Sequence, residues 1–109
     1  MIKNSFHDFI VFDIFANIQQ VTSRRMMGGW CIYVQSIPIS IIVDDNWYIK
    51  TKDNTLIQEL VSHGSQKFEY TRKNGKIITM AYWVIPEDLL DQREYLETII
   101  ERVLDENII

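Results

Sequence analysis

The sequence predicts an α+β fold in which helices flank an antiparallel β-sheet. Two stretches, near residues 6–18 and 94–104, repeat apolar residues at helical spacing. Between them, the chain from Val21 to Lys50 alternates with a period of two, which is typical of strands. The pair Asn74-Gly75 then marks a further hairpin. A meander plus a hairpin, with one helix before, one within and one after the strands, accounts for this order.

The first helix is expected to run from about Phe6 to Ile18. Ser5 and Asp8 form a helix-start pattern. The apolar positions recur at helical spacing and are Phe6, Phe9, Ile10, Ile14, Phe15 and Ile18. Val11, Phe12 and Ala16 widen this surface almost all the way round the helix, beyond what one packed layer covers. Two explanations follow: the helix lies deep in the domain, or it makes a subunit contact in a homodimer.

The strands of the meander are separated by turn residues. Trp30, Ile32 and Val34 are expected to share one face of a strand, and the next strand is expected to do the same with Ile37, Ile39, Ile41 and Val43. Gly28-Gly29 and Asp44-Asp45-Asn46 stand where turns need such residues. Trp47 to Lys50 forms the next strand, paired antiparallel to the one before it.

The second half of the chain contains a small helix, a hairpin and the closing helix. Thr55 with Gln58 resembles a capping box, and Gly64 suits a left-handed helix end. Lys67–Thr71 and Ile77–Val84 are predicted strands. Pro86 suits a first helical position, and Asp91 with Glu94 precedes the clearest helix. Its apolar stripe consists of Leu96, Ile99, Ile100, Val103 and Leu104.

Composition indicates a single domain over residues 1–109. The chain has 47% hydrophobic and 24% charged residues, and its formal net charge of -4 argues against a large contact with nucleic-acid phosphates. Cys31 is the only cysteine, so no intramolecular disulfide forms and a reducing compartment fits best. Neither a secretion signal nor a membrane-spanning stretch is visible. A cytoplasmic protein is therefore expected.

No catalytic, metal or cofactor site is expected, and the chain is not predicted to be an enzyme. Gly28-Gly29 lacks the further glycines and the lysine of a phosphate loop, so it is interpreted as a turn. His7 and His63 have no metal ligands at suitable spacing, and Cys31 is interpreted as a small packing residue. The acids Asp44 and Asp45 are explained by a turn. Glu87, Asp88 and Asp91 are explained by the first turns of helices.

Two groups of basic residues are the best candidates for contact with an acidic partner. Arg24 and Arg25 precede the glycine pair, and Arg72, Lys73 and Lys76 surround the predicted hairpin turn. Tyr70, Tyr82 and Trp83 lie near that hairpin, and aromatic residues among cations anchor protein interfaces or stack on bases. The alternative is that the cations are solvated strand ends and the aromatic residues belong to the core.

Several segments together resemble a known family. Val21-Thr22-Ser23-Arg24-Arg25-Met26-Met27-Gly28-Gly29 resembles the opening of the N-terminal domain of TfoX/Sxy proteins, bacterial regulators of DNA transformation competence. Asp44-Asp45 with Trp47-Tyr48-Ile49-Lys50 is similar to the family's strand pair, and Phe68-Glu69-Tyr70 with Gly75-Lys76 is similar to its hairpin. The segment 80–90, Met80 to Leu90, follows in the same order. The resemblance covers about residues 6–104.

The resemblance implies a helix-flanked antiparallel sheet related to secretion chaperones, with no known catalytic centre. It also implies a transcriptional co-regulator that works through protein contacts beside the cyclic-AMP receptor protein. Full-length regulators carry a second domain after this one, so a stand-alone form is expected. Gln35-Ser36-Ile37-Pro38 replaces the family's Asp-Gly turn, and that hairpin is expected to differ.

Three functions remain open from the sequence: a protein-binding module, a nucleic-acid-binding module, and a small-molecule-binding domain. A homodimer is compatible with each of them. The candidate partner-binding residues are Arg24, Arg25, Gly28, Gly29, Tyr70, Arg72, Lys73, Lys76 and Tyr82.

Overall fold

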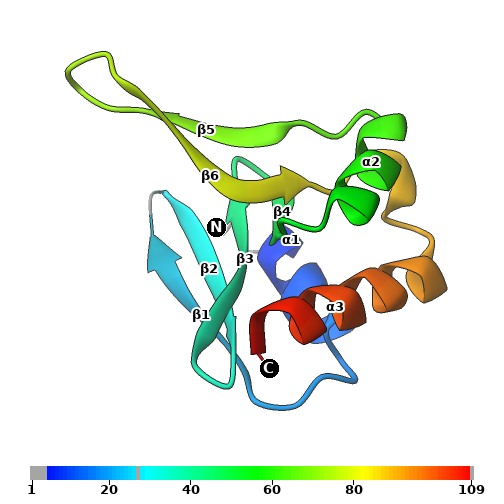
Figure 1. Cartoon of the computed structure of the whole chain (residues 1–109). Coiled ribbons are helices and arrows are strands. Elements are labelled where there is room, and N and C mark those ends of the chain that lie inside the picture. Colours follow the sequence, from blue (N-terminus) through cyan, green and yellow to red (C-terminus); the bar gives the residue numbers. More distant parts are fainter. Residues whose placement is uncertain (1–4, 27, 109) are drawn as a thin grey trace.

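The computed structural model describes residues 5–26 and 28–108, and their strands form one six-stranded antiparallel sheet (Figure 1). The strands are β1 (Val21–Met26), β2 (Gly29–Val34), β3 (Ile37–Val43), β4 (Asn46–Lys50), β5 (Lys67–Thr71) and β6 (Ile77–Val84). Their order in space is β1-β2-β3-β4-β6-β5. The first four strands make a meander, and β6 pairs with β4, which leaves β5 at the edge. The predicted α+β class with an antiparallel sheet is confirmed.

The helices gather on one face of this sheet (Figure 1). They are α1 (Ser5–Asp8), the π-helix η1 (Phe9–Ile14), α2 (Asn54–Ser62), the 3₁₀-helix η2 (Glu87–Leu89) and α3 (Arg93–Ile108). Among the described residues, no helix is long and apolar enough to span a bilayer.

The main core lies between the helices and the sheet face that they cover. Burial of apolar side chains there is the dominant favourable contribution to folding. The sheet contributes residues such as Ile32, Ile39, Trp47 and Ile49, and the helices contribute Ile10, Ile14, Leu56, Leu60, Leu96, Ile99, Ile100 and Val103. The four buried positions of α3 belong to the apolar stripe predicted for the closing helix.

The first helix is shorter and more widely wound than the predicted span from Phe6 to Ile18. It is α-helical only through Asp8, and the π-helix that follows ends at Ile14. The N–H of Phe15 donates to the carbonyl of Ile10 at 3.0 Å, an i→i+5 bond that brings these two buried residues to the same side. Phe12 is 69% exposed, and the homodimer stays a prediction.

The prediction that Ile37, Ile39, Ile41 and Val43 share one face is wrong. Ile32 pairs with Ser40 and Tyr33 pairs with Pro38, so Ile39 is an extra residue in β3. Proline has no N–H to donate to a central strand and is accommodated at such bulges. Ile37 and Ile39 therefore pack under the helices. Beyond the bulge the alternation is reversed, and Ile41 and Val43 lie on the opposite face.

The turns differ in detail from the expected ones. The β2–β3 turn consists of Gln35 and Ser36, and the β3–β4 turn of Asp44 and Asp45, all four with positive φ as in type I′ hairpins. Met27, which precedes the turn expected at Gly28-Gly29, lies outside the described residues. Helix α2 is capped by Asp53, whose carboxylate accepts from the N–H of Thr55 at 2.9 Å, so the expected cap at Thr55 was two residues late. Gly64 has the predicted left-handed backbone, with φ +97.

Candidate functional site

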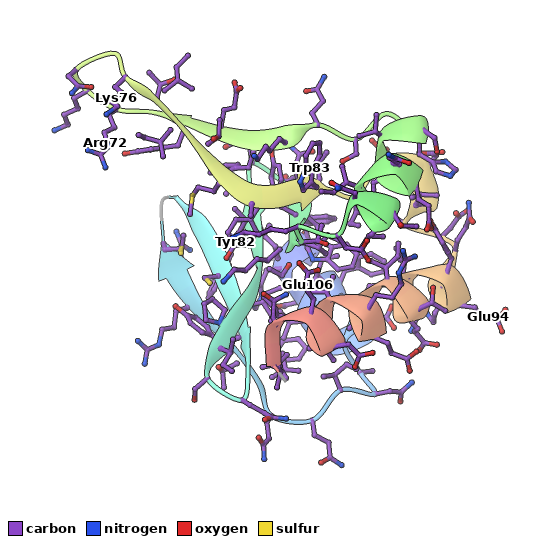
Figure 2. All side chains as sticks on the ribbon, viewed as in Figure 1. Arg72, Lys76, Tyr82, Trp83, Glu94 and Glu106 are labelled. Atoms are coloured by element: carbon purple, nitrogen blue, oxygen red, sulfur yellow. The ribbon has the colours of Figure 1, made fainter. Side chains whose placement is uncertain are left out.

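The sheet face opposite the helices carries its own apolar cluster, which we call the open face. Because neighbouring residues of a strand point to opposite faces, Trp83 packs towards the helices while Tyr82 lies on the open face (Figure 2). Four side chains of the cluster are buried: Cys31, Ile41, Phe68 and Tyr82. Around them lie the half-buried Met26, Tyr33, Val43, Tyr48 and Met80. Among the described residues, no helix covers this cluster.

Two buried titratable groups of the open face, Tyr82 and Cys31, are neutral at pH 7. Burial, with smaller contributions from the neighbouring Cys31 and Tyr33, raises the pKa of Tyr82 to about 12. Burial also raises the pKa of the Cys31 thiol, so at neutral pH it is a thiol rather than a nucleophilic thiolate. The face therefore offers apolar and aromatic surface for contact.

Arg24 stands at one border of the open face. Its Cα pairs with that of Cys31 across β1 and β2, which places both side chains on the same side of the sheet. The guanidinium carbon lies 5.9 Å from the centroid of the Tyr33 ring, a cation–π distance. An exposed cation thus lies beside the aromatic cluster.

Arg25 points to the other face, so the two adjacent arginines do not share one surface. Its guanidinium lies 5.1 Å from the ring of Trp30, which in turn lies 4.0 Å from the His7 ring. The imidazole of His7 is held by Asp8 and by the hydroxyl of Ser23, each at 2.8 Å. This cluster borders a cavity of about 230 Å³ that is also lined by Gly28, Gly29, Asp44 and Asp45.

The two glycines have different structural tasks. Gly28 has a φ of +75°, in the left-handed region, and a Cβ there would meet no atom within 4 Å. Gly29 begins β2, and a Cβ on it would lie 1.8 Å from the carbonyl oxygen of Ile42. The close approach of the backbones explains a glycine at position 29 without any ligand.

The β5–β6 hairpin projects beyond the rest of the sheet (Figure 1). Its turn is closed by bonds from Gly75 N–H to the Arg72 carbonyl at 2.9 Å and from Arg72 N–H to the Lys76 carbonyl at 2.8 Å, with Gly75 left-handed. Figure 2 shows Arg72 and Lys76 at the tip. Lys73 belongs to the same exposed turn, and Tyr70 is 44% exposed on the strand that leads into it.

The described structure thus brings some of the candidate residues together and separates others. Tyr70 pairs with Ile78, two and four residues before Met80 and Tyr82, so it continues the open face along the projecting hairpin. Arg24 lies on the same face at the opposite border of the sheet. Arg25, Gly28 and Gly29 line the separate cavity.

A family model for the TfoX N-terminal domain matches residues 13–107. The chain belongs to this family. No curated protein matches the sequence. Membership supports a competence-related regulatory domain as the general description of the chain.

The cations and the acids of this TfoX N-terminal domain are concentrated in different segments of the chain. Strand pairs β1–β2 and β5–β6 carry Arg24, Arg25, Lys67, Arg72, Lys73 and Lys76 against the single acid Glu69. Residues 87–106 carry eight acids against Arg93 and Arg102. Both of these arginines pair with carboxylates, whereas none of the six cations of the two hairpins does so among the described residues.

The sequence interpretation of this TfoX N-terminal domain missed part of the open face. Met26, Tyr33, Tyr48 and Met80 were not identified as candidates, although they pack on the cluster beside Tyr82. The alternation of side chains along the strands could have identified them. Tyr48, for example, stands between the core residues Trp47 and Ile49 and therefore lies on the opposite face. A central strand with apolar residues on both faces does not show which face the helices cover.

Proposed function

We propose that this domain is a regulatory protein-binding module, that it acts as a transcriptional co-regulator through protein contacts, and that its open face binds the partner. The observation that carries the proposal is the combination of an uncovered aromatic cluster with bordering cations that have no carboxylate partner among the described residues. Membership in the TfoX N-terminal domain family supports the regulatory part.

The composition of the open face fits a protein interface. Interfaces are enriched in Tyr, Met and Arg and combine an apolar centre with a polar border. Here Tyr33, Tyr48 and Met80 surround the buried centre, and Arg24 and Arg72 are the exposed cations that we place at its border. The partner expected from this arrangement presents apolar side chains flanked by carboxylates, because opposite charges favour encounter and correct orientation.

The experiment is a capture of proteins from native lysate with the tagged domain, followed by mass spectrometry. The test variant combines Arg24→Glu with Arg72→Glu, and a matched control reverses two cations away from the open face, Lys52→Glu with Lys67→Glu. Recovery of a transcription factor or polymerase subunit by the wild type and the control, but not by the test variant, supports the proposal. Equal recovery by all three proteins contradicts it.

Nucleic-acid binding is the second candidate, and the projecting hairpin favours it. Arg72, Lys73 and Lys76 surround its turn, and the exposed ring of Tyr70 lies next to them. Lys and Arg side chains contact phosphates, and aromatic rings stack on bases, so the residues of this turn are of the types that bind nucleic acids. Fluorescence polarisation with a labelled oligonucleotide tests it: the affinity should fall steeply with rising salt, and absence of binding at low salt rejects this candidate.

A further inference from the structure

On the helical side of the domain, a groove runs between α3 and the segment that follows η1. Two adjoining cavities of about 200 and 320 Å³ share Asn17 and Ile18. In Figure 1 this segment passes alongside α3. The apolar residues that line the two cavities are the core residues Ile14, Val34 and Ile100, which are buried at their floor, and the half-buried Ile18, Leu104 and Ile108.

Helix α3 presents two parallel rows of side chains to this groove. Ile100, Leu104 and Ile108 form an apolar row at i, i+4 and i+8, in which Ile100 belongs to the core and Leu104 and Ile108 are half-buried. The second row, with the same spacing, consists of Glu97, Glu101 and Asp105. Each row extends about 12 Å along the helix, at a rise of about 1.5 Å per residue.

The acidic row is not explained by the fold. Like charges four residues apart on a helix repel one another and destabilise it. Within residues 5–26 and 28–108, Glu97, Glu101 and Asp105 take part in no ion pair. Among the described residues, one side-chain hydrogen bond reaches the row, from the amide of Asn17 to Glu97 at 3.3 Å. Three carboxylates thus lie beside the groove with no paired cation in the part of the chain that the structure describes.

We infer that this groove binds a basic amphipathic helix of a partner protein. Such a helix places apolar residues at i, i+4 and i+7 against the apolar row, as in other helix-in-groove complexes. Lys or Arg residues at every fourth position on its flank lie beside Glu97, Glu101 and Asp105. In both helices, side chains four residues apart are separated by about 6 Å along the helix axis. This surface is distinct from the open face, so the domain joins an acidic partner on one side to a basic partner on the other.

The test is a titration of the full, isotope-labelled chain followed by NMR. The probe is a synthetic 18-residue helical peptide with Leu at i, i+4, i+7 and i+11, Lys beside this stripe, and Ala elsewhere. The reference peptide has the same composition in an order without a stripe. Saturable shifts at the amides of Ile18, Gln35 and Leu104 with the first peptide only are expected.

Two charge-matched variants make the test specific. Glu97→Gln, Glu101→Gln and Asp105→Asn together should weaken peptide binding at least tenfold. Glu87→Gln, Asp91→Asn and Glu94→Gln together remove three charges outside the groove, and Glu94 points away from the domain in Figure 2. This control should change the affinity less than twofold. The open-face variant, Arg24→Glu with Arg72→Glu, should bind the peptide as the wild type does.

Three results would overturn the inference. One is the absence of saturable binding, and another is equal weakening in the two charge-matched variants. The third is a dimer in light scattering that the groove variant alone dissociates, because a second copy of the chain would then fill the groove.

Discussion

The indole N–H of Trp47 donates to the hydroxyl oxygen of Ser40 at 2.6 Å, and both residues are buried. The same hydroxyl donates to the carbonyl of Tyr48, also at 2.6 Å. Ser40 reaches this position because the bulge at Ile39 turns it towards the helices. A polar residue in the core is thus satisfied on both sides, as buried hydroxyls and indole N–H groups require.

Ser40→Ala should lower the free energy of unfolding by about 1–3 kcal/mol, because it leaves the Trp47 N–H without an acceptor in the core. Urea denaturation followed by Trp fluorescence measures the change. Ser62→Ala, at an exposed position of α2, serves as the control. A Ser40 variant as stable as the wild type would show that the Trp47–Ser40 bond contributes nothing to the fold.

Substitutions at the two adjacent glycines should have unequal costs. Gly28→Ala places a side chain on a left-handed residue with free space around it, at a cost of about 1–2 kcal/mol. Gly29→Ala forces β2 away from the Ile42 carbonyl, so it should cost more and reduce the yield of folded protein. Thermal unfolding of both variants compares them. Equal melting temperatures would contradict the close approach of the two strands.

Ionisation of the buried Tyr82 should lower the free energy of unfolding at alkaline pH. Its pKa in the folded chain, about 12, lies above the ordinary value of 10.0. The stabilisation is therefore fully present below pH 10 and is lost as the pH rises through 12, with at most about 2–3 kcal/mol involved. In Tyr82→Phe the decline should be shallower, although Tyr48 and Tyr95, whose pKa values are also raised by burial, retain part of it. Stability curves between pH 9 and pH 12 measure the difference, and identical slopes would contradict the assignment.

Glu106 fastens the end of α3 to the loop after β4. Its carboxylate accepts from the hydroxyl of Thr51 at 2.7 Å and from the N–H of Lys52 at 2.6 Å, and Figure 2 shows it directed towards the sheet. Glu106→Ala should lower the free energy of unfolding by about 1–3 kcal/mol, since both donors lose their acceptor. Glu101→Ala, which removes an exposed acid of the same helix, should cost nothing in urea denaturation. Equal effects of the two variants would leave Glu106 without a structural role.

Local signals predicted the elements that local chemistry controls. The strands Lys67–Thr71 and Ile77–Val84 have their predicted bounds, because β-branched and aromatic residues flank an Asn-Gly turn. The prediction that Ile41 shares a face with Ile39 was wrong. The bulge at Ile39 depends on how β3 pairs with β2, which the sequence of β3 alone does not determine. The predicted first helix was longer than the observed one, because the periodicity of its apolar residues does not distinguish an α-helix from a π-helix.

The candidate site was predictable only in part. Alternation along β1 already places Arg24 and Arg25 on opposite faces, so their separation follows from the sequence once the strand is accepted. The gathering of Tyr33, Tyr48 and Tyr82 on one uncovered surface does not, because it depends on the order of the strands in space and on the face that the helices choose.

Hydrogen–deuterium exchange of the domain, alone and with the captured partner, tests most directly whether the open face is the binding surface. We expect new protection in β1, β2, β6 and the β5–β6 turn, and its loss when Arg24→Glu and Arg72→Glu are combined. Protection confined to α2 and η2, with the strands unchanged, would contradict the proposed function.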